Sequence, residues 1–154
     1  PDRQEGVALW WYVWRNAHFD VITHGTEPLF IGRDLREITL GHQVDLLLYR
    51  YNFPVGVARI TFHGTTAHLS AFALMKEIRT PQNLRVLYQL AMHRAATCNA
   101  ELIFTSGADE TGQTVSRDLG FVDSGSIVCY AETPVTDQQE VDDIHVAEPI
   151  FILR

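Results

Sequence analysis

Residues 69–121 decide the fold, and they read LSAFALMKEI RTPQNLRVLY QLAMHRAATC NAELIFTSGA DETGQTVSRD LGF. The apolar stretch 67–75 predicts a strand, and Pro81 then begins a helix at a position where its missing N–H is not needed. Apolar residues recur every three or four positions until Asn99, a residue type that tolerates the left-handed conformation at a helix end. Residues 102–105 (LIFT) predict the next strand. A strand, a helix and a strand in this order predict a right-handed crossover between parallel strands.

Further strands are predicted on both sides of this unit. Two apolar stretches precede it, and the short turns between them predict an antiparallel meander. The strands of this meander are 44–51, 55–62 and 67–75, with turns at 52–54 and 63–66. Downstream, a short helix ended by Gly120 leads to two late strands, the second of which starts at Pro149, where proline is tolerated. These elements are the helix 111–119 and the strands 126–130 and 149–153, with an acidic, solvated connection at 136–143.

The N-terminal part is less regular. The apolar and aromatic run 7–14 (VALWWYVW) predicts a buried strand. Residues 30–40 have weak helical spacing, so short helices and an irregular loop both stay open for 16–43. No internal repeat, low-complexity stretch or linker interrupts 1–154, and we therefore expect one domain with an α+β fold, a mixed sheet and few helices.

Composition and charge limit the function classes. The net charge is −7, which argues against nucleic-acid binding, because such proteins need clustered Lys and Arg. No apolar run approaches the ~18 residues of a membrane span, and the first residues lack the basic-then-apolar pattern of a signal peptide. Cys98 and Cys129 form no framework, which predicts free thiols in a reducing compartment and makes the cytoplasm the expected location.

The order of elements over 44–154 resembles the GNAT acetyltransferase superfamily. In that family the central strand leads into a turn of the form Arg/Gln-x-x-Gly-x-Gly/Ala and then into a long helix. The matching turn here is RTPQNL, in which Arg79 stands at the family's arginine while Gln82 and Leu84 replace the two glycines. The LGF at 119–121 matches a frequent family ending. The resemblance implies a GNAT-like mixed, mostly antiparallel sheet with a central strand-helix-strand cofactor core.

The resemblance also implies a coenzyme A site. In the family the glycine-rich turn and the helix start bind the pyrophosphate, and a helix N-terminus suits an anion because it has unpaired N–H groups and a positive dipole end. Leu74 and Met75 are expected to contact the pantetheine arm through their backbone groups. The expected cofactor-binding residues are Leu74, Met75, Arg79, Gln82, Asn83, Leu84 and Arg85.

Three residues are candidates for the proton transfers of acyl transfer. The family often places a basic carboxylate near the start of the central strand; His68 occupies that stretch, and its ordinary pKa near ~6.5 suits a base. Glu77, just past the strand, is a second candidate base. Ser116 stands where the family often has a tyrosine that protonates the leaving thiolate, and Tyr130 is an alternative residue for that role. Structural roles are also open: His68 as a strand histidine, Glu77 as a solvated turn carboxylate, and Tyr130 as a half-buried strand aromatic. No metal site is expected, because the histidines form no H-E-x-x-H motif.

Two functions remain open. One is an acyl-CoA-dependent N-acyltransferase that transfers the acyl group of acetyl-CoA or another acyl-CoA to a small-molecule or peptide amine, by direct attack in a ternary complex. An acyl donor carried by a carrier protein is a variant of this hypothesis. The alternative is a catalytically inactive GNAT-fold binding or inhibitor module that acts through protein–protein contact. The aromatic first strand and the sheet edges favour a homodimer, and no nucleic-acid or membrane partner is expected.

Overall fold

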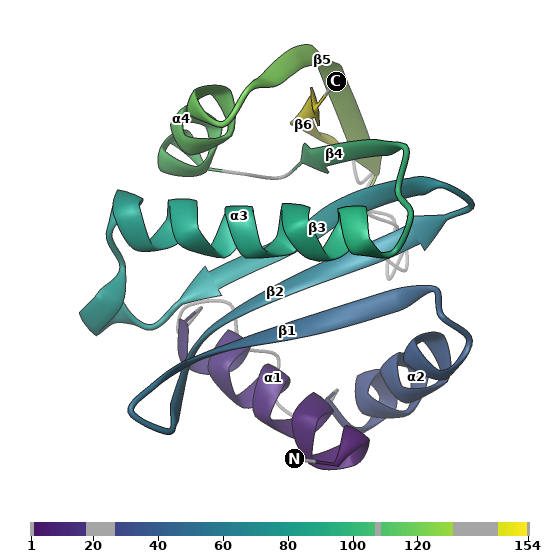
Figure 1. The fold of residues 1–154 in the computed structure, drawn as a ribbon, viewed down its shortest axis with the longest axis vertical. Coiled ribbons are helices and arrows are strands. Elements are labelled where there is room, and N and C mark those ends of the chain that lie inside the picture. Colours follow the sequence, from purple (N-terminus) through teal and green to yellow (C-terminus); the bar gives the residue numbers. More distant parts are fainter. Residues whose placement is uncertain (1, 18–26, 107–108, 131–144, 154) are drawn as a thin grey trace, which may run out of the picture.

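The computed structural model describes residues 2–17, 27–106, 109–130 and 145–153. In these residues a six-stranded sheet, in the order β1-β2-β3-β4-β6-β5, carries helices on both faces (Figure 1). The strands are β1 (Gln43–Arg50), β2 (Phe53–His63), β3 (Thr66–Leu74), β4 (Leu102–Ser106), β5 (Phe121–Tyr130) and β6 (His145–Leu153). The helices are α1 (Arg3–Ala17), α2 (Glu27–Thr39), α3 (Pro81–Thr97) and α4 (Glu110–Asp118), with a short 3-10 helix η2 (Lys76–Ile78).

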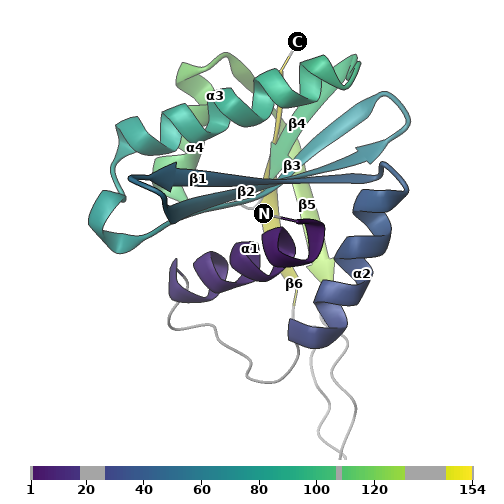
Figure 2. The ribbon, with the colours of Figure 1, turned by 60° about the horizontal axis from the view of Figure 1, so that its bottom comes forward.

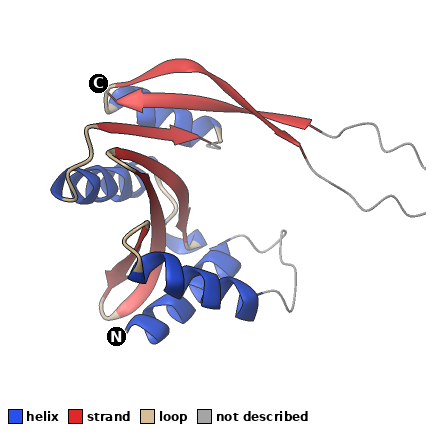
Figure 3. Cartoon of the chain, turned by 90° about the vertical axis from the view of Figure 1, so that its right-hand side faces the viewer, coloured by secondary structure: helices blue, strands red, loops and turns tan. Residues whose placement is uncertain are grey.

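The sheet is mixed and mostly antiparallel, as predicted. β1, β2 and β3 form an antiparallel meander, and β6 is antiparallel to both β4 and β5. Only β3 and β4 pair in parallel among the described strands, and α3 is the crossover between them. β5 and β6 form a long pair beside the shorter β4 (Figure 3).

The two faces of the sheet have separate cores. α3 and α4 cover one face, and α1 and α2 cover the other (Figure 2). Under α3, the buried side chains of Leu87 and Tyr88 join Leu69 of β3 in the larger cluster. Under α1, Trp10 and Val57 belong to a smaller cluster. Because both faces are covered, β2 is buried on both sides, which explains its nearly continuous burial from residue 56 to residue 60.

The parallel strands β3 and β4 separate after a few residues, and this separation positions the site. Their ladder ends at the pair Leu69–Thr105, whereas β3 continues to Leu74. At the same point the register between β2 and β3 shifts, so that Ser70 has no Cα partner on β2. A bulge of this kind bends a strand and redirects the residues after it. The second half of β3 therefore keeps β2 as a neighbour on one side but has no strand on its β4 side.

The strand predicted for 7–14 is wrong, because this segment lies within the helix α1. Its buried residues are Val7, Trp10, Val13 and Ala17, and this spacing of three or four places them on one helical face. The indole N–H of Trp10 donates to the carbonyl of Ala58 at 3.0 Å, which ties the helix to β2. The run 7–14 is apolar at almost every position, which is typical of a buried strand, and only the spacing of its buried residues indicates a helix.

A buried charged cluster holds α2 and α1 against the sheet. The guanidinium of Arg59 on β2 donates to Asp34 of α2 at 2.7 Å and to Asp45 of β1 at 2.8 Å. The same group lies 4.0 Å from the ring centroid of Trp10, within cation–π range. Trp11 donates its indole N–H to Asp34 at 2.8 Å. The weak helical spacing in 30–40 thus belongs to a real helix, which is one of the two alternatives left open.

Several predicted boundaries need correction. The β1–β2 turn is at Tyr51 and Asn52, both with positive φ, rather than at 52–54, because β2 already begins at Phe53. Pro149 is not the first residue of its strand but lies inside β6. It is opposite Ser126 of β5, next to a register shift, and it has no partner on β4, whose pairing with β6 begins at Ile150; proline is tolerated at such irregular positions. The positive φ expected of a left-handed helix end is present at Asn99. The acidic connection at 136–143 lies outside the described residues.

Candidate functional site

A cleft of about 500 Å³ opens where β3 leaves β4. One wall is the second half of β3, and the opposite wall is formed by Ser106 and the first turn of α4. The N-terminal half of α3 lines the cleft from one face of the sheet, and the C-terminal end of α1 lines it from the other. Its lining residues are Trp14, Ala17, Ser70, Ala71, Phe72, Ala73, Leu74, Arg79, Thr80, Pro81, Leu84, Tyr88, Ser106, Asp109, Thr111 and Gly112.

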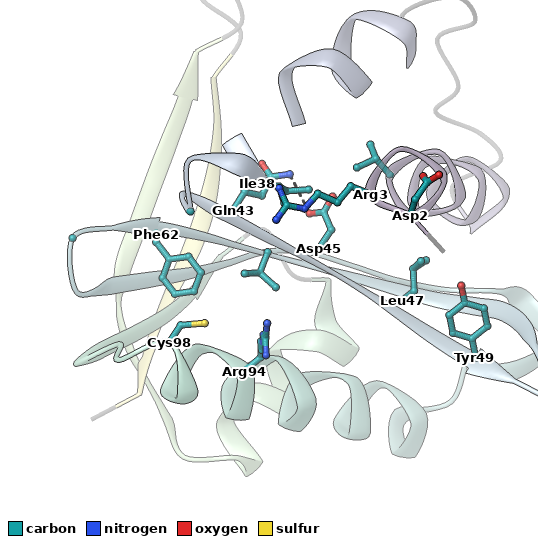
Figure 4. A pocket seen from close by; sticks show the side chains of 15 residues that line it. Asp2, Arg3, Ile38, Gln43, Asp45, Leu47, Tyr49, Phe62, Arg94 and Cys98 are labelled. Atoms are coloured by element: carbon teal, nitrogen blue, oxygen red, sulfur yellow. Dashed lines mark hydrogen bonds between the residues drawn. The ribbon is translucent and has the colours of Figure 1, made fainter. Parts of the chain in front are cut away.

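A second, larger hollow of about 680 Å³ follows the edge strand β1 (Figure 4). Arg3 of α1 and Arg94 of α3 approach it from opposite faces of the sheet. Its buried carboxylate, Asp45, is already paired with Arg59. From α3 and its C-cap this hollow is lined only by Arg94 and Cys98, and it contains none of the expected cofactor or catalytic residues, so we place the candidate site in the smaller cleft.

The first turn of α3 is strongly capped. The Thr80 hydroxyl accepts a hydrogen bond from the backbone N–H of Asn83 at 3.1 Å, and Pro81 has no N–H to offer. The side-chain amide of Asn83 donates to the carbonyl of Ile78 at 2.7 Å. Within the described residues, Gln82 is left as the first-turn position whose backbone N–H has no partner. A phosphate at this helix start would therefore find one free backbone donor together with the helix dipole.

Arg79 spans the cleft between two backbone carbonyls. Its guanidinium donates to the carbonyl of Leu74 at 3.1 Å, at the end of β3, and to that of Ala17 at 2.8 Å, at the end of α1. The latter bond satisfies one of the carbonyls that a helix C-terminus leaves unpaired. The arginine that matches the family turn thus serves to join α1 to β3 in this structure.

The expected cofactor residues fall into two groups. Those that line the cleft are Leu74, Arg79 and Leu84. Those that do not line it are Met75, Gln82, Asn83 and Arg85. Gln82 and Arg85 are exposed near the start of α3, whereas the backbone N–H of Met75 is engaged by the Val55 carbonyl at 2.8 Å.

His68 does not line the cleft and lies two residues before Ser70, the first β3 residue that does. Its Nε2 is 2.7 Å from the Oγ of Ser106, and its ring stacks on Phe104 with centroids 4.4 Å apart. Burial lowers the pKa of His68 below 6.5, and the charge of nearby His63 lowers it further. His68 is therefore neutral at physiological pH and can accept a proton, and Ser106 is the member of the pair that faces the cleft.

Glu77 and Ser116 are not brought together with His68. Glu77 is exposed on η2. Ser116 is fully buried in α4 and donates its hydroxyl proton to the carbonyl of Gly112 at 2.7 Å. Neither residue lines the cleft. The backbone of Tyr130, the alternative phenol, lies in β5, but its side chain is outside the description.

One phenol in the cleft wall was not predicted from the sequence. Tyr88 of α3 is 2% exposed and stacks on Phe72 with centroids 3.8 Å apart. Burial raises the pKa of Tyr88, while hydrogen bonds with Ser116 and Thr105 lower it in part. Tyr88 lies in the apolar stripe of α3, so its spacing indicated a core residue and gave no sign of a role for its hydroxyl. Ser106 was missed for another reason, because its proximity to His68 depends on the register between β3 and β4.

The described residues contain neither a candidate metal site nor a candidate membrane-spanning helix. No group of three or more His, Cys, Asp or Glu side chains is arranged to hold a metal ion in this part of the chain. None of the described helices is both long enough and apolar enough to cross a membrane.

The fold and the cleft together define a class of protein. It is an α+β chain in which the parallel strands β3 and β4 separate, and the cleft between them reaches the start of α3. No protein-family model and no curated protein matches the sequence. Solved structures do. A ribosomal-protein-alanine N-acetyltransferase from Brucella melitensis matches with a TM-score of 0.70 at 13% identity, over 97% of this chain and 96% of that one. The ribosomal-protein-S18-alanine N-acetyltransferase from Escherichia coli gives 0.68 at 12%, over 96% and 86%.

A third match is the PaiA N-acetyltransferase from Thermoplasma acidophilum, solved in complex with coenzyme A. Its TM-score is 0.60 at 11% identity, over 99% of this chain and 93% of that one. At such low identities the likeness shows the fold and not the activity. The chain has the fold of the GNAT N-acetyltransferases, and the fold implied by the sequence resemblance is confirmed.

Proposed function

We propose that this chain is an acyl-CoA-dependent N-acyltransferase that transfers an acyl group directly to an amine in a ternary complex. The observation that carries the proposal is the cleft between β3 and β4, which opens at the start of α3. Beyond Leu69, β3 has no strand on its β4 side. An extended pantetheine arm with its two amides could pair there as an added strand.

The donor would lie along the cleft with its phosphates near the start of α3. The free N–H of Gln82 and the exposed guanidinium of Arg85 are the groups that would meet the pyrophosphate. The side chains of Gln82 and Leu84 reduce the space that glycines would leave, so the phosphates would sit farther from the helix axis. The acceptor amine would enter from the α1 side, past Trp14 and Ala17.

Binding of acetyl-CoA tests this proposal directly. The melting temperature is followed while acetyl-CoA, coenzyme A and a longer acyl-CoA are titrated. At about a hundredfold excess over the dissociation constant, a ligand of the folded state adds about 2.7 kcal/mol of stability. If none of the three compounds shifts the melting temperature, the proposal is wrong, and an inactive module that acts through protein–protein contact becomes the better interpretation.

A matched pair of variants tests where the phosphates bind. Arg85→Glu reverses a charge near the start of α3, and Arg94→Glu makes the same change near its C-terminal end, beside the other hollow. We expect Arg85→Glu to weaken acetyl-CoA binding about tenfold, which corresponds to about 1.4 kcal/mol. Arg94→Glu should change the dissociation constant by less than about twofold, because solvent screens a charge at that distance. Equal effects of the two variants would place the phosphates elsewhere.

A further inference from the structure

We propose that Ser106 is a catalytic residue that carries the proton of the acceptor amine from the cleft to His68. The inference rests on the proposed acyl transfer and adds the route of its proton. His68, the titratable base, does not line the cleft, whereas its hydrogen-bond partner Ser106 does.

The backbone register fixes this pair. In the parallel ladder His68 is opposite Phe104, so Ser106 lies two residues further along β4. Successive side chains of a strand alternate between faces, and Thr105 is on the α3 face, where its hydroxyl is hydrogen-bonded with Tyr88 of α3 and donates to the carbonyl of Leu69 at 3.2 Å. Ser106 therefore lies on the opposite face, with His68 and on the side of α1. Its distance of 2.7 Å from the Nε2 of His68 is short for a hydrogen bond of this kind.

The surroundings of the pair favour a neutral imidazole that accepts a proton. The ring of His68 stacks on Phe104, which fixes its orientation. Within the described residues no carboxylate is paired with His68, so nothing there stabilises a permanent imidazolium. In the tautomer that fits a base, Nδ1 carries the proton and Nε2 accepts from the hydroxyl of Ser106.

The relay balances with acyl-CoA and an amine as the only reactants. The amine nitrogen attacks the thioester carbonyl carbon and forms a tetrahedral adduct with a protonated nitrogen. Ser106 takes this proton on Oγ as its own proton passes to Nε2 of His68. The C–S bond then breaks, the amide forms, and the leaving thiolate takes a proton from the imidazolium by the reverse path. The products are an amide and coenzyme A with a free thiol, and both side chains return to their initial state.

Kinetic variants test the relay. Ser106→Ala, Ser106→Thr and His68→Gln are compared in a thiol-release assay with acetyl-CoA and a panel of primary amines. We expect Ser106→Ala and His68→Gln each to lower kcat by about a hundredfold, the usual scale of general base catalysis. The double variant should be no worse than either single one, because the two residues act as a unit. Ser106→Thr should recover most of the rate, whereas Ser124→Ala, on the exposed start of β5, should keep the wild-type rate.

Two measurements separate this relay from other roles of the serine. ¹⁵N NMR of the imidazole should show the Nδ1–H tautomer in the wild-type protein; an Nε2–H tautomer, in which His68 donates to Ser106, would overturn the proposal. Intact mass after incubation with acetyl-CoA should show no adduct, and an acetyl group on Ser106 would replace the relay with covalent catalysis. A wild-type kcat for Ser106→Ala would also overturn it. Failure of acetyl-CoA to shift the melting temperature is a separate result, which refutes the proposed acyl transfer itself.

Discussion

Removing the Arg59 guanidinium is expected to destabilise the protein strongly. Arg59 makes hydrogen bonds of 2.7 Å to Asp34 and of 2.8 and 3.0 Å to Asp45, and both carboxylates are buried. Arg59→Met keeps an unbranched apolar stem but leaves two buried acids without their cation. Breaking a buried ion pair from one side typically costs about 3–5 kcal/mol. For a chain of this size that loss lowers the melting temperature by roughly 6–20 °C.

The pH dependence of this loss follows from Asp45. Burial already raises the pKa of Asp45 above 3.8, although the hydrogen bond and charge of Arg59 lower it in part. An acid with a raised folded-state pKa binds more protons in the folded state, so the free energy of unfolding falls as pH rises from 3.8 through the folded pKa. Arg59→Met removes the lowering effect and raises the folded pKa further. The destabilisation should therefore be largest at neutral pH and smaller below about pH 4.

The assay is urea unfolding of the wild type and the variant from pH 4 to pH 7.5. Arg36→Met is the matched control, because Arg36 is 69% exposed and its nearest acid, Glu37, is 3.7 Å away. Solvent screens such a surface pair, and the control should change stability only slightly. Adding Asp34→Asn and Asp45→Asn to Arg59→Met should restore part of the loss, since no unpaired charge then remains. A loss below about 1 kcal/mol at pH 7, or one that grows toward acid pH, would contradict this reasoning.

Three further outcomes are expected. Because burial lowers the pKa of His68 below 6.5, the unfolded state binds its proton more readily; the stability from this group is complete above pH 6.5 and is lost as pH falls through the folded pKa. His68→Gln should abolish this part of the pH dependence in urea unfolding, and an unchanged profile would exclude His68 as its source. Tyr88→Phe should cost about 1 kcal/mol in the same assay, because the hydroxyls of Ser116 and Thr105 lose a buried partner; a stabilised variant would mean that the phenol is not bonded there. Thr80→Ala should cost about 1 kcal/mol through loss of the α3 cap, unless another group accepts from the Asn83 N–H, in which case calorimetry would show no change.

The central part of the fold was predictable because each local signal agreed with the next. Pro81 and Asn99 define the bounds of a helix with a clear apolar stripe, and apolar strands lie on both sides of it. The N-terminal helix was not predicted, because the aromatic run 7–14 is apolar almost throughout and its buried face is apparent only from the spacing of residues such as Trp10 and Val13.

The places of the candidate residues in the fold were predictable, but their contacts were not. The sequence placed His68 on the central strand and Arg79 at the turn, and the structure has both residues there. What each side chain bonds to depends on distant segments. The partner of His68 comes from the next strand, and one partner of Arg79 comes from the end of α1. Spacing along one segment cannot give a register between two strands or the position at which a helix from elsewhere ends.

Arg79 has a consequence for the width of the cleft. Leu74 belongs to the β3 wall, Ala17 belongs to α1, which lines the cleft from one face of the sheet, and one guanidinium holds the carbonyls of both. At this end the distance between α1 and β3 is thus held by the length and planarity of a single side chain, and not by strand pairing. A lysine here would keep the positive charge but lose the fixed fork of donors, so the gap would no longer have a defined span. In this chain Arg79 acts as a spacer that fixes where the end of α1 lies over the end of β3, beside the cleft.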